Sequence, residues 1–472
     1  MHRKQPLEAK SGAFYKNTAM KIRRISEFQY KIDFQNREEH LDTYKAGFLS
    51  SNLGKIYQSL PWQALIETLG LKDSKKGPQS IFSPKGKVAL MFLKHYAACS
   101  DRKLIEQLNG NLDYQFFCDL YLPVGHRIQN YKIVSAIRCE LAELLDVSKM
   151  QTTLINSWLP YLNNLNSITS DATCYESSIR YPTDVKLLWE AISWSYKELK
   201  SLSRRAGVKL LRTKYRKWER RYISYSKMKK KRRKKRKVLK RALLHLLNKV
   251  NGQLDSLEKE VRARSLSTHY HRRRSTIKLI YWQQQEMFTK GLKRIKDRIV
   301  SIDKPYIRPI IRGKENKLVE FGAKVNKLQI DGISFIEHLN FNAFNEGIRL
   351  IKTVFLAQKL TGKKVKVVGA DAIYANNKNR NFVSKHGIKT DFKPKGRRSK
   401  HRKHQDQLAW MITKERASRL EGSFGTDKEH FLLKKNLART RKTEILMIFF
   451  GIHTSNALNI GRRIAKKAKI AA

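Results

Sequence analysis

The sequence predicts an α/β domain that is preceded by an N-terminal helical region and interrupted after its first strand by a basic helical segment. The spacing of apolar residues carries this prediction. No proline occurs between Pro182 and Pro305, and apolar residues recur at three- and four-residue spacing from Leu243 to Leu257, which predicts long helices. After residue 303, apolar and polar residues alternate and then give way to helical patterns, which predicts strands and helices in turn.

Composition favours a folded protein with a polyanionic partner. The chain has 472 residues, of which 41% are hydrophobic, and this excludes wholesale disorder. The length is typical of about two to four domains. Lys and Arg number 99 against 40 Asp and Glu, which gives a net charge of +59. Such a charge favours nucleic acid, because each cation that neutralises a phosphate releases a bound counterion; an acidic membrane surface is the alternative.

The cysteines and the apolar runs bear on the compartment. The closest two of the four cysteines, Cys99 and Cys118, stand 19 positions apart, so there is no Cys-x-x-Cys metal motif. The N-terminal segment lacks the apolar core of a signal peptide, and the longest apolar run, Ile445 to Phe450, is too short to span a bilayer. We therefore expect a cytoplasmic protein with no membrane partner.

Residues 1–150 are predicted to form a helical region. The stretch from Leu49 to Gly70 indicates two short helices. The predicted core, about residues 81–126, indicates a helix, a break at residues 98–100, a second helix that Ser100 would cap, and an aromatic third helix. This pattern is compatible with a DNA-binding helix-turn-helix and equally with other small helical bundles.

Nearly half of the excess positive charge lies in residues 201–300, which hold 34 Lys or Arg against six acids. From Lys227 to Arg241, 12 of 15 residues are basic. Such a run is either a solvated helical face or a surface that contacts phosphates. We favour phosphate contact, because the bases repel one another unless an anion neutralises them. The residues that we expect to bind DNA here are Lys231, Arg232, Arg233, Lys234, Lys235 and Arg236.

The elements of the α/β domain are predicted in chain order. A strand around residues 168–175 precedes the basic helical segment. After that segment we expect strands at 318–325 and 327–335, with a tight turn at Asp331 and Gly332. The remaining elements are a helix at about 345–360, a strand from Lys364, a helix from Asn379, a short strand from Ile388, a basic loop and a helix at about 406–425.

Two aspartates stand at predicted strand ends, where open α/β sheets place their sites. Asp171 follows the strand that ends at Ser170, and Asp371 follows the strand that ends at Ala370. Joining phosphodiesters without a covalent nucleophile needs divalent metal, and carboxylates that converge from separate elements suit two hard cations. From spacing alone, each aspartate could equally cap a turn or a helix.

Four sequence blocks, in this order, resemble the DDE transposases of bacterial insertion sequences: SITSDATCYESSIRYPTDVKLLWEAI, IRPIIRGKENKLVEFGAKV, VVGADAIYANNKNR and RLEGSFGTDKEHFLL. The segment SDRKLIEQLNGNLDYQFFCDL is similar to the small N-terminal helical domain that many of them carry. The resemblance covers residues 80–200 and 300–460, approximately. It implies an RNase H-like catalytic core in which two Asp and one Glu hold two Mg²⁺ ions per active site, with Mn²⁺ able to substitute.

By the same resemblance, the catalytic and metal-binding acids are Asp171 in SDATCYES, Asp371 in GADAIYAN and Glu421 in RLEGSFG. Tyr374 stands where such transposases often have an aromatic residue, and we expect it to contact DNA. Lys428 follows Glu421 by seven residues, close to two helical turns. If the helix continues past Gly425, the Lys428 ammonium would lie on the Glu421 face and suit a DNA phosphate.

The basic partner of Glu421 departs from the family pattern, which usually has Arg four residues before the Glu. That position is Ala417, with Arg416 and Arg419 on either side, and Arg416 is the candidate for DNA binding. The basic loop is expected to touch backbone phosphates close to the active site, with plain solvation as the alternative. Its candidate residues are Lys395, Arg397 and Arg398.

Other acids compete with these assignments less well. Glu176 would begin the segment that leaves the first strand, and Asp184 would cap the next helix. Asp331 belongs to a turn. Glu415 stands six residues before Glu421, which puts it well round the helix.

The expected organisation has residues 1–150 binding DNA ends, residues 151–198 and 304–472 forming the catalytic domain, and residues 199–303 forming the basic insertion. The resemblance implies a transposase of the bacterial cytosol or nucleoid. It would bind the terminal inverted repeats of its own element, cleave there and join the 3′-hydroxyl to target DNA. Pairing two ends requires a homodimer or a higher oligomer. The alternatives are a decayed, non-catalytic nucleic-acid-binding protein and an RNase H-like nuclease without strand transfer.

Overall fold

The computed structural model describes residues 41–73, 80–123, 125–261, 266–314, 317–395 and 402–471. The contacts divide the chain into two compact units, Met1–Ala46 and Gly47–Ala472. Of the first unit, the described residues include only the start of α1 (Leu41–Ser50). All the elements that follow α1 belong to the second unit.

A series of helices opens the second unit. They are α2 (Asn52–Ser59), α3 (Trp62–Leu69), α4 (Pro84–Ala97), α5 (Asp101–Gly110), α6 (Leu112–Phe117), α7 (Lys132–Leu144) and α8 (Val147–Trp158). Ala98 adopts a left-handed conformation (φ 47°) and ends α4. The Ser100 hydroxyl accepts a hydrogen bond from the Lys103 N–H and caps α5. The break predicted at residues 98–100 and the cap predicted at Ser100 are therefore confirmed.

The strands form one mixed sheet, which has seven strands within the described residues. They are β1 (Ser167–Ser177), β2 (Pro309–Lys314), β3 (Lys317–Ile330), β4 (Ile333–Asn340), β5 (Val367–Ala370), β6 (Lys389–Thr390) and β7 (Lys435–Asn436). The order is β2-β3-β1-β5-β6, with β4 beside β3 and β7 beside β1. Because β1 pairs antiparallel with β3 and parallel with β5, it is an interior strand.

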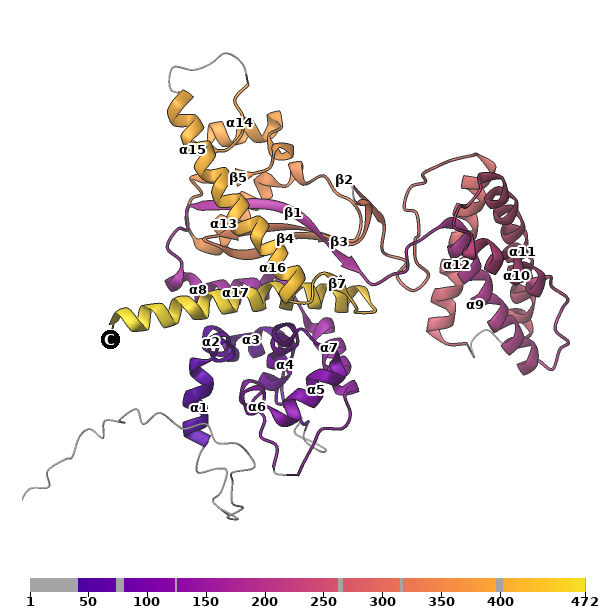
Figure 1. Ribbon diagram of the computed structural model, residues 1–472, viewed down its shortest axis with the longest axis horizontal. Helices are drawn as coiled ribbons and strands as arrows, with labels where there is room; N and C mark the ends of the chain where they lie inside the picture. Colours follow the sequence, from indigo (N-terminus) through magenta and orange to yellow (C-terminus); the bar gives the residue numbers. More distant parts are fainter. Residues whose placement is uncertain are drawn as a thin grey trace, which may run out of the picture. The chain divides into compact units, whose positions relative to one another are not determined.

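Helices cover both faces of this sheet. Adjacent residues of a strand point to opposite faces. On β3, Asn326 donates to Thr353 of α13 (Leu350–Thr361), whereas Lys327 donates to Ser423 of α16 (Gly422–His430), so α13 and α16 lie on opposite faces. α15 (Arg402–Glu415), the π-helical turn η6 (Arg416–Glu421) and α16 follow one another without a break, and we refer to residues 402–430 as the rod (Figure 1).

The N-terminal helices and the sheet share one hydrophobic core. α17 (Arg441–Ala471) packs against α2, α4 and α7 on one side and against β4 on the other. The rings of Phe92 in α4 and Phe450 in α17 lie 4.8 Å apart, edge to face. The boundary expected at residue 150 also falls inside α8, so the helical region is not separate from the sheet. Smaller elements are α14 (Asn377–Lys385), η2 (Leu159–Tyr161), η4 (Glu346–Ile348) and η5 (Ala372–Tyr374).

Four described helices lie between β1 and β2 in the chain: α9 (Asp184–Arg205), α10 (Tyr215–Lys227), α11 (Arg233–Glu260) and α12 (Thr268–Thr289). They have a hydrophobic core of their own, in which α9 packs against α11. The helical spacing from Leu243 to Leu257 is confirmed by α11. The boundary expected at residue 198 falls inside α9, whose buried face belongs to this second core. Among the described helices we find none with the length and hydropathy of a bilayer span.

The strands after residue 303 differ from the prediction. β3 runs unbroken through residue 326, so the strands expected at 318–325 and 327–335 are one strand and the start of β4. Asp331 and Gly332 have φ angles of 46° and 80° and form the tight turn as predicted. Asn326 and Lys327 are consecutive polar residues, and they interrupt the alternating pattern that would have predicted one strand. Both are fully buried and donate hydrogen bonds to helices on the two faces.

Several other boundaries differ as well. The helix expected at about 345–360 begins only at Leu350, after η4, because Asn345 caps η4 by accepting from the Gly347 N–H. The strand expected from Lys364 is limited to the four residues of β5. The helix expected at about 406–425 extends in both directions to form the rod. β2 and α17 were not predicted.

A buried ion pair fastens the rod to the sheet. The Lys327 ammonium lies 2.8 Å from an Asp427 carboxylate oxygen and donates to the Ser423 hydroxyl at 3.0 Å. The Tyr175 hydroxyl of β1 donates to the same Asp427 oxygen at 2.6 Å. The side chains of Lys327 and Asp427 are 0% and 1% exposed. Burial lowers the pKa of Lys327, and Asp427 opposes this shift. These contacts join β1, β3 and α16 at one point.

Replacing Lys327 by Met is expected to destabilise the protein strongly, because it leaves the Asp427 carboxylate buried without its cation. Breaking a buried pair typically costs about 3–5 kcal/mol of unfolding free energy. Chemical denaturation of the full chain measures this loss.

Lys434→Met is the matched control, because Lys434 pairs with Glu429 at 2.9 Å but both side chains are more than half exposed. Exposed pairs contribute little. Equal destabilisation by Lys327→Met and Lys434→Met would contradict the role that we assign to the buried pair.

Candidate active site

The sheet register brings two of the predicted acids together. β1 and β5 run parallel, with Ser170 opposite Ala370. One residue further along both strands, Asp171 therefore lies beside Asp371. The chain leaves β5 at Asp371, whose carboxylate accepts the Ala372 N–H at 2.7 Å and caps η5. Both carboxylates thus stand at the carboxyl end of β5, where open α/β sheets build their sites. β1 continues to Ser177, so Asp171 lies inside its strand and not after the strand's end as predicted.

Asp171 has a costly environment for a carboxylate. Its burial, first of all, and the like charges of Glu346 and Asp371 raise its pKa to about 6 from an ordinary 3.8. The hydrogen bond from the Ala172 N–H, 2.7 Å long, and the positive charge of Arg416 oppose this rise. The local excess of negative charge favours a bound cation.

The third predicted acid lies on the rod. Glu421 is the last residue of η6, next to the fully buried Leu420, and its own side chain is half exposed. Arg416, at the start of η6, donates to Glu421 at 3.1 Å. The Arg416 side chain is only 13% exposed, and its Nε lies 3.8 Å from a carboxylate oxygen of Asp391. Single π turns of this kind are often found at functional sites. Arg416 therefore stands between two carboxylates.

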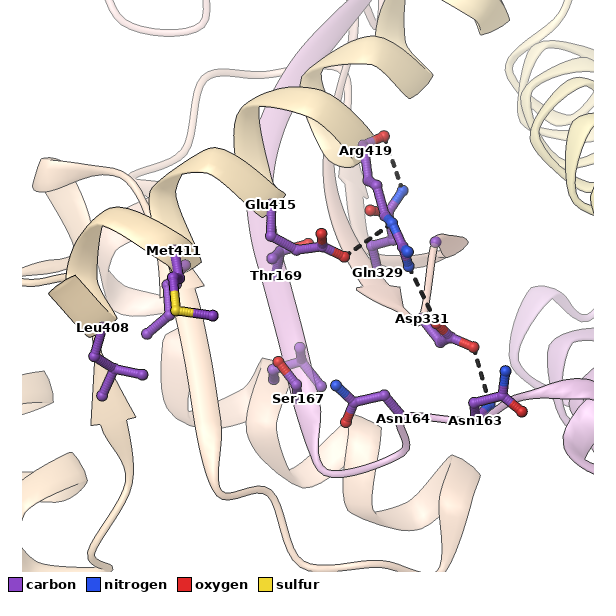
Figure 2. A pocket seen from close by; sticks show the side chains of 13 residues that line it. Asn163, Asn164, Ser167, Thr169, Gln329, Asp331, Leu408, Met411, Glu415 and Arg419 are labelled. Carbon is purple, nitrogen blue, oxygen red and sulfur yellow. Dashed lines mark hydrogen bonds and ion pairs between the residues drawn. The ribbon is translucent and has the colours of Figure 1, made fainter.

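Arg419, the other candidate partner of Glu421, points elsewhere. Figure 2 shows its guanidinium between Glu415 and Asp331, at 2.9 Å and 3.1 Å, on the edge of a cavity of about 510 Å³ beside the start of β1. Glu415 and Asp331, both weighed as rival acids, are thus paired with this arginine. Arg416, and not Arg419, is therefore the arginine in contact with Glu421, and the DNA contact expected of Arg416 stays a prediction.

A metal site would require the three acids to converge. Carboxylate oxygens suit hard cations such as Mg²⁺, and the adjacency of Asp171 and Asp371 fits such a site. In the part of the chain that the structure describes, no group of three or more His, Cys, Asp or Glu side chains is placed to hold a metal ion. The structure thus brings Asp171 and Asp371 together and keeps Glu421 on the adjoining rod, paired with Arg416.

Lys428 lies on the same side of the sheet as Asp171. The helix continues past Gly425, which meets the condition stated from the sequence. The Lys428 ammonium donates to the Thr173 hydroxyl at 3.0 Å. Thr173 is two residues from Asp171 on β1, and residues at this spacing share a face. A cation therefore stands about 7 Å along the strand from the first acid.

The expected DNA contact of Tyr374 is wrong. Tyr374 is fully buried, and its hydroxyl donates to Asn326 of β3 at 2.6 Å. Burial raises its pKa well above the ordinary value. An aromatic residue at this position fixes the turn after Asp371 from the inside and has no surface to offer DNA.

The predicted DNA-binding bases are placed differently from one another. Lys395 is exposed and donates to Asn377 at 2.8 Å, near the start of α14. Arg397 and Arg398 lie outside the described residues. The bases of the basic run are all exposed, in the first residues of α11 and just before it: Lys231, Arg232, Arg233, Lys234, Lys235 and Arg236.

Asp391 is a site residue that the sequence reasoning missed. Its side chain is 4% exposed, and it accepts the Ala370 N–H at 3.1 Å while facing Arg416. Burial raises its pKa, and Arg416 opposes that shift. It therefore links the end of β5, just before Asp371, to the rod. The available signal was an acid next to Phe392 in a predicted strand, a position where an apolar residue is usual.

Glu346 is a second missed acid. It belongs to η4 and lies 2.7 Å from the Lys324 ammonium of β3, with both side chains largely buried. The carbonyl of the next residue, Gly347, accepts hydrogen bonds from Asn376 and Asn379 on α14. These bonds hold η4 against the segment that follows Asp371, which explains why Glu346 influences Asp171. No sequence pattern marks it.

The rival acid Asp184 lies among the helices between β1 and β2. The cap of α9 is Thr183, not Asp184 as predicted, because the Thr183 hydroxyl accepts the Lys186 N–H. Asp184 pairs instead with Lys240 of α11 and with Arg298. Its carboxylate is therefore engaged away from Asp171 and Asp371.

Replacing Asp171 by Asn is expected to stabilise the metal-free protein at neutral pH. The folded-state pKa of about 6 exceeds the ordinary 3.8, so the ionised carboxylate opposes folding above pH 6. The gain is up to about 3 kcal/mol, and it fades as the pH falls from about 6 towards about 4. Denaturation in the presence of a chelator, as a function of pH, measures it.

Asp73→Asn, which changes an exposed aspartate outside the site, is the control and should show no such gain. A variant Asp171→Asn that is no more stable than the parent at neutral pH would refute this account of the site's electrostatics.

Asp391 and Arg416 are expected to be energetically coupled. In the unfolding free energies of Asp391→Asn, Arg416→Gln and the double variant, contact between the groups predicts an interaction energy of about 0.5–3 kcal/mol. Asp331→Asn is the control, because Asp331 pairs with Arg419 and Arg463 rather than with Arg416. Additive effects of Asp391→Asn and Arg416→Gln would show that Asp391 does not act on the rod through Arg416.

Comparison with known families gives two matches. Residues 368–453 match the family described as Transposase DDE domain, and residues 39–138 match the family described as Transposase domain (DUF772). The first match includes Asp371 and the whole rod, and the second includes α2 to α6. Searches of curated proteins and of solved structures gave no significant match. Both matches are to transposase domains, one before and one after the helices between β1 and β2, and together they indicate that the chain is similar to the DDE transposases of insertion sequences.

Proposed function

We propose that this transposase binds the terminal inverted repeats of its own element, cleaves the DNA at each end and joins the freed 3′-hydroxyl to target DNA. The observation that carries the proposal is the register of β1 and β5, which supports Asp171 and Asp371 as a pair of catalytic carboxylates. Cleavage and joining are both phosphoryl-transfer steps with in-line attack at phosphorus, so one site can serve the two steps in turn.

Asp171, Asp371 and Glu421 would hold two Mg²⁺ ions, with Mn²⁺ able to substitute. When bound, such ions activate the attacking oxygen and stabilise the leaving oxygen. The raised pKa of Asp171 and the like charges around it support a site that is completed by cations. Glu421 would have to leave its contact with Arg416, and its half-exposed side chain leaves it room to turn.

Arg416 and Lys428 supply fixed positive charge next to the acids. Arg416 neutralises Glu421 before cations arrive and keeps Asp391 as its second carboxylate partner. Lys428, held over β1 by Thr173, is suited to a phosphate of the bound DNA strand. Both groups are ordered by contacts within the protein, so little conformational freedom is lost when DNA binds.

We infer an RNase H-like core built from the sheet, α13 and the rod. The helices from Asp184 to about residue 303 would be an insertion after β1, shifted from the expected start at residue 199 by the continuity of α9. The helical region before β1 would bind the DNA ends. The exposed run from Lys231 to Arg236 would contact phosphates, since bases without nearby acids bind polyanions with release of counterions. Two ends require at least two copies of the chain.

Asp371→Asn is expected to lower cleavage and strand transfer at least about 100-fold, because the loss of a metal-binding carboxylate removes several kcal/mol of transition-state stabilisation. The assay uses labelled DNA that carries the element's own end, with Mg²⁺ or Mn²⁺. DNA binding should persist, since the Lys and Arg side chains that contact DNA are unchanged.

Glu429→Gln is the control, because Glu429 is an exposed acid of the rod that pairs with Lys434. Full activity of Asp371→Asn would contradict the assignment of the site. DNA binding by the parent protein without any metal-dependent cleavage would favour a decayed binder, and cleavage without joining would favour a nuclease.

A further inference from the structure

A groove of about 650 Å³ lies between the rod and α17. Along the rod its wall is a stripe of residues at four-residue spacing, Ser418, Gly422, Thr426 and His430. Residues at this spacing lie on one face of a helix. Ser455, Asn459 and Arg462 form the facing wall on α17. Three of the four rod residues in this stripe are small, and a Cβ atom added at Gly422 would meet nothing within 4 Å, so the groove is open there.

The groove is positively charged. Arg419, Arg462 and Arg463 line it, and among the described residues no acidic side chain does. Asp331 lies behind this lining and pairs with Arg419 at 3.1 Å and with Arg463 at 2.8 Å. Arg463 also donates to the carbonyl of Tyr161. Arg419 also pairs with Glu415 at 2.9 Å, so two carboxylates orient two of the guanidinium groups. The third, Arg462, is exposed and leaves the groove with net positive charge.

The positive charge continues along α17. Arg462, Lys466 and Lys469 are exposed and follow one another at spacings of four and three residues, which places them along one side of the helix. From Ile445 to the last residue of the chain there are five bases and no acid. At about 1.5 Å per residue, the stretch from Asn459 to Lys469 is about 15 Å long.

The shape and the charge favour an extended polyanion. A small phosphorylated ligand would need an enclosed pocket, whereas an open groove that leads into a basic stripe suits successive phosphates on one strand of a duplex. Glu421 and Gly422 are consecutive residues, so their side chains point about 100° apart around the rod. The groove therefore faces a different direction around the rod from Glu421.

We propose that the groove and the basic side of α17 bind the sugar-phosphate backbone of a DNA duplex next to the segment held at the acids. The contact reads no base sequence, because guanidinium and ammonium groups here face phosphates. The proposal rests on the proposed function in one respect only, namely that the partner is DNA. It gives the rod three roles, with one face packed on the sheet, one bearing Glu421 and one facing this second DNA segment.

The test is the salt dependence of duplex binding by the full-length double variant with Arg462→Gln and Lys466→Gln. Each lost phosphate contact lowers the slope of log K against log salt by about 0.9, so the expected decrease is about 1.8. The decrease should be the same for duplexes of unrelated sequence. Ser418→Glu, which adds a negative charge on the rod side of the groove, should also lower affinity and would tie the effect to the groove itself.

The control is Lys363→Gln with Lys364→Gln, which removes two charges from an exposed loop before β5, at the end of the strand away from the acids. It should leave the slope unchanged. An unchanged slope in the Arg462 and Lys466 variant, or an equal decrease in the control, would overturn the proposal. Metal-dependent cleavage tests the proposed function separately: a parent protein that binds duplexes through the groove without cutting them would refute the function and leave the groove standing.

Discussion

The geometry of the candidate site depends on the buried pair of Lys327 and Asp427. An ammonium and a carboxylate in an apolar interior are costly unless they meet each other and further polar partners, and here Ser423 and Tyr175 supply those partners. Lys327 is paired in register with Asp171 across β1 and β3. Lys327 therefore lies beside Asp171 and is bound to the rod, which carries Glu421. The ion pair of Lys327 and Asp427 thus sets how the sheet and the rod face each other.

Several acids of this strongly basic chain lie close together at the candidate site, where their like charges repel. Asp171 feels the charges of Glu346 and Asp371, and Asp391 feels that of Asp371 as well. Arg416 is the internal cation that makes this arrangement tolerable, because it faces two of the carboxylates and influences a third. Such a cluster is poorly balanced without further positive charge, which is a physical reason for a site that takes up cations.

Local sequence patterns predicted the parts of the structure that local physics decides. The Ser100 cap and the turn at Asp331 were found because hydroxyl capping and positive φ angles each need particular residues. The position of Asp371 at the end of β5 was also accessible, whereas Asp171 lies inside β1, and the adjacency of the two depends on a register between strands nearly 200 residues apart. Tyr374 was misjudged and Asp391 overlooked, since the burial of each is decided by partners distant in the chain.

The π turn is where these constraints meet. Leu420 is buried against the sheet, and seven residues later Asp427 is fixed by Lys327, so the rod cannot rotate about its axis without breaking the buried pair. The π turn between Arg416 and Glu421 is wider than an α-helical turn, so side chains five positions apart come into contact. In the family pattern the Arg and the Glu are four positions apart. The same shift leaves Ser418 and Gly422 on the groove side. A basic residue five positions before the Glu is therefore compatible with the site because the helix is π-helical there, and the departure from the family pattern has a structural compensation.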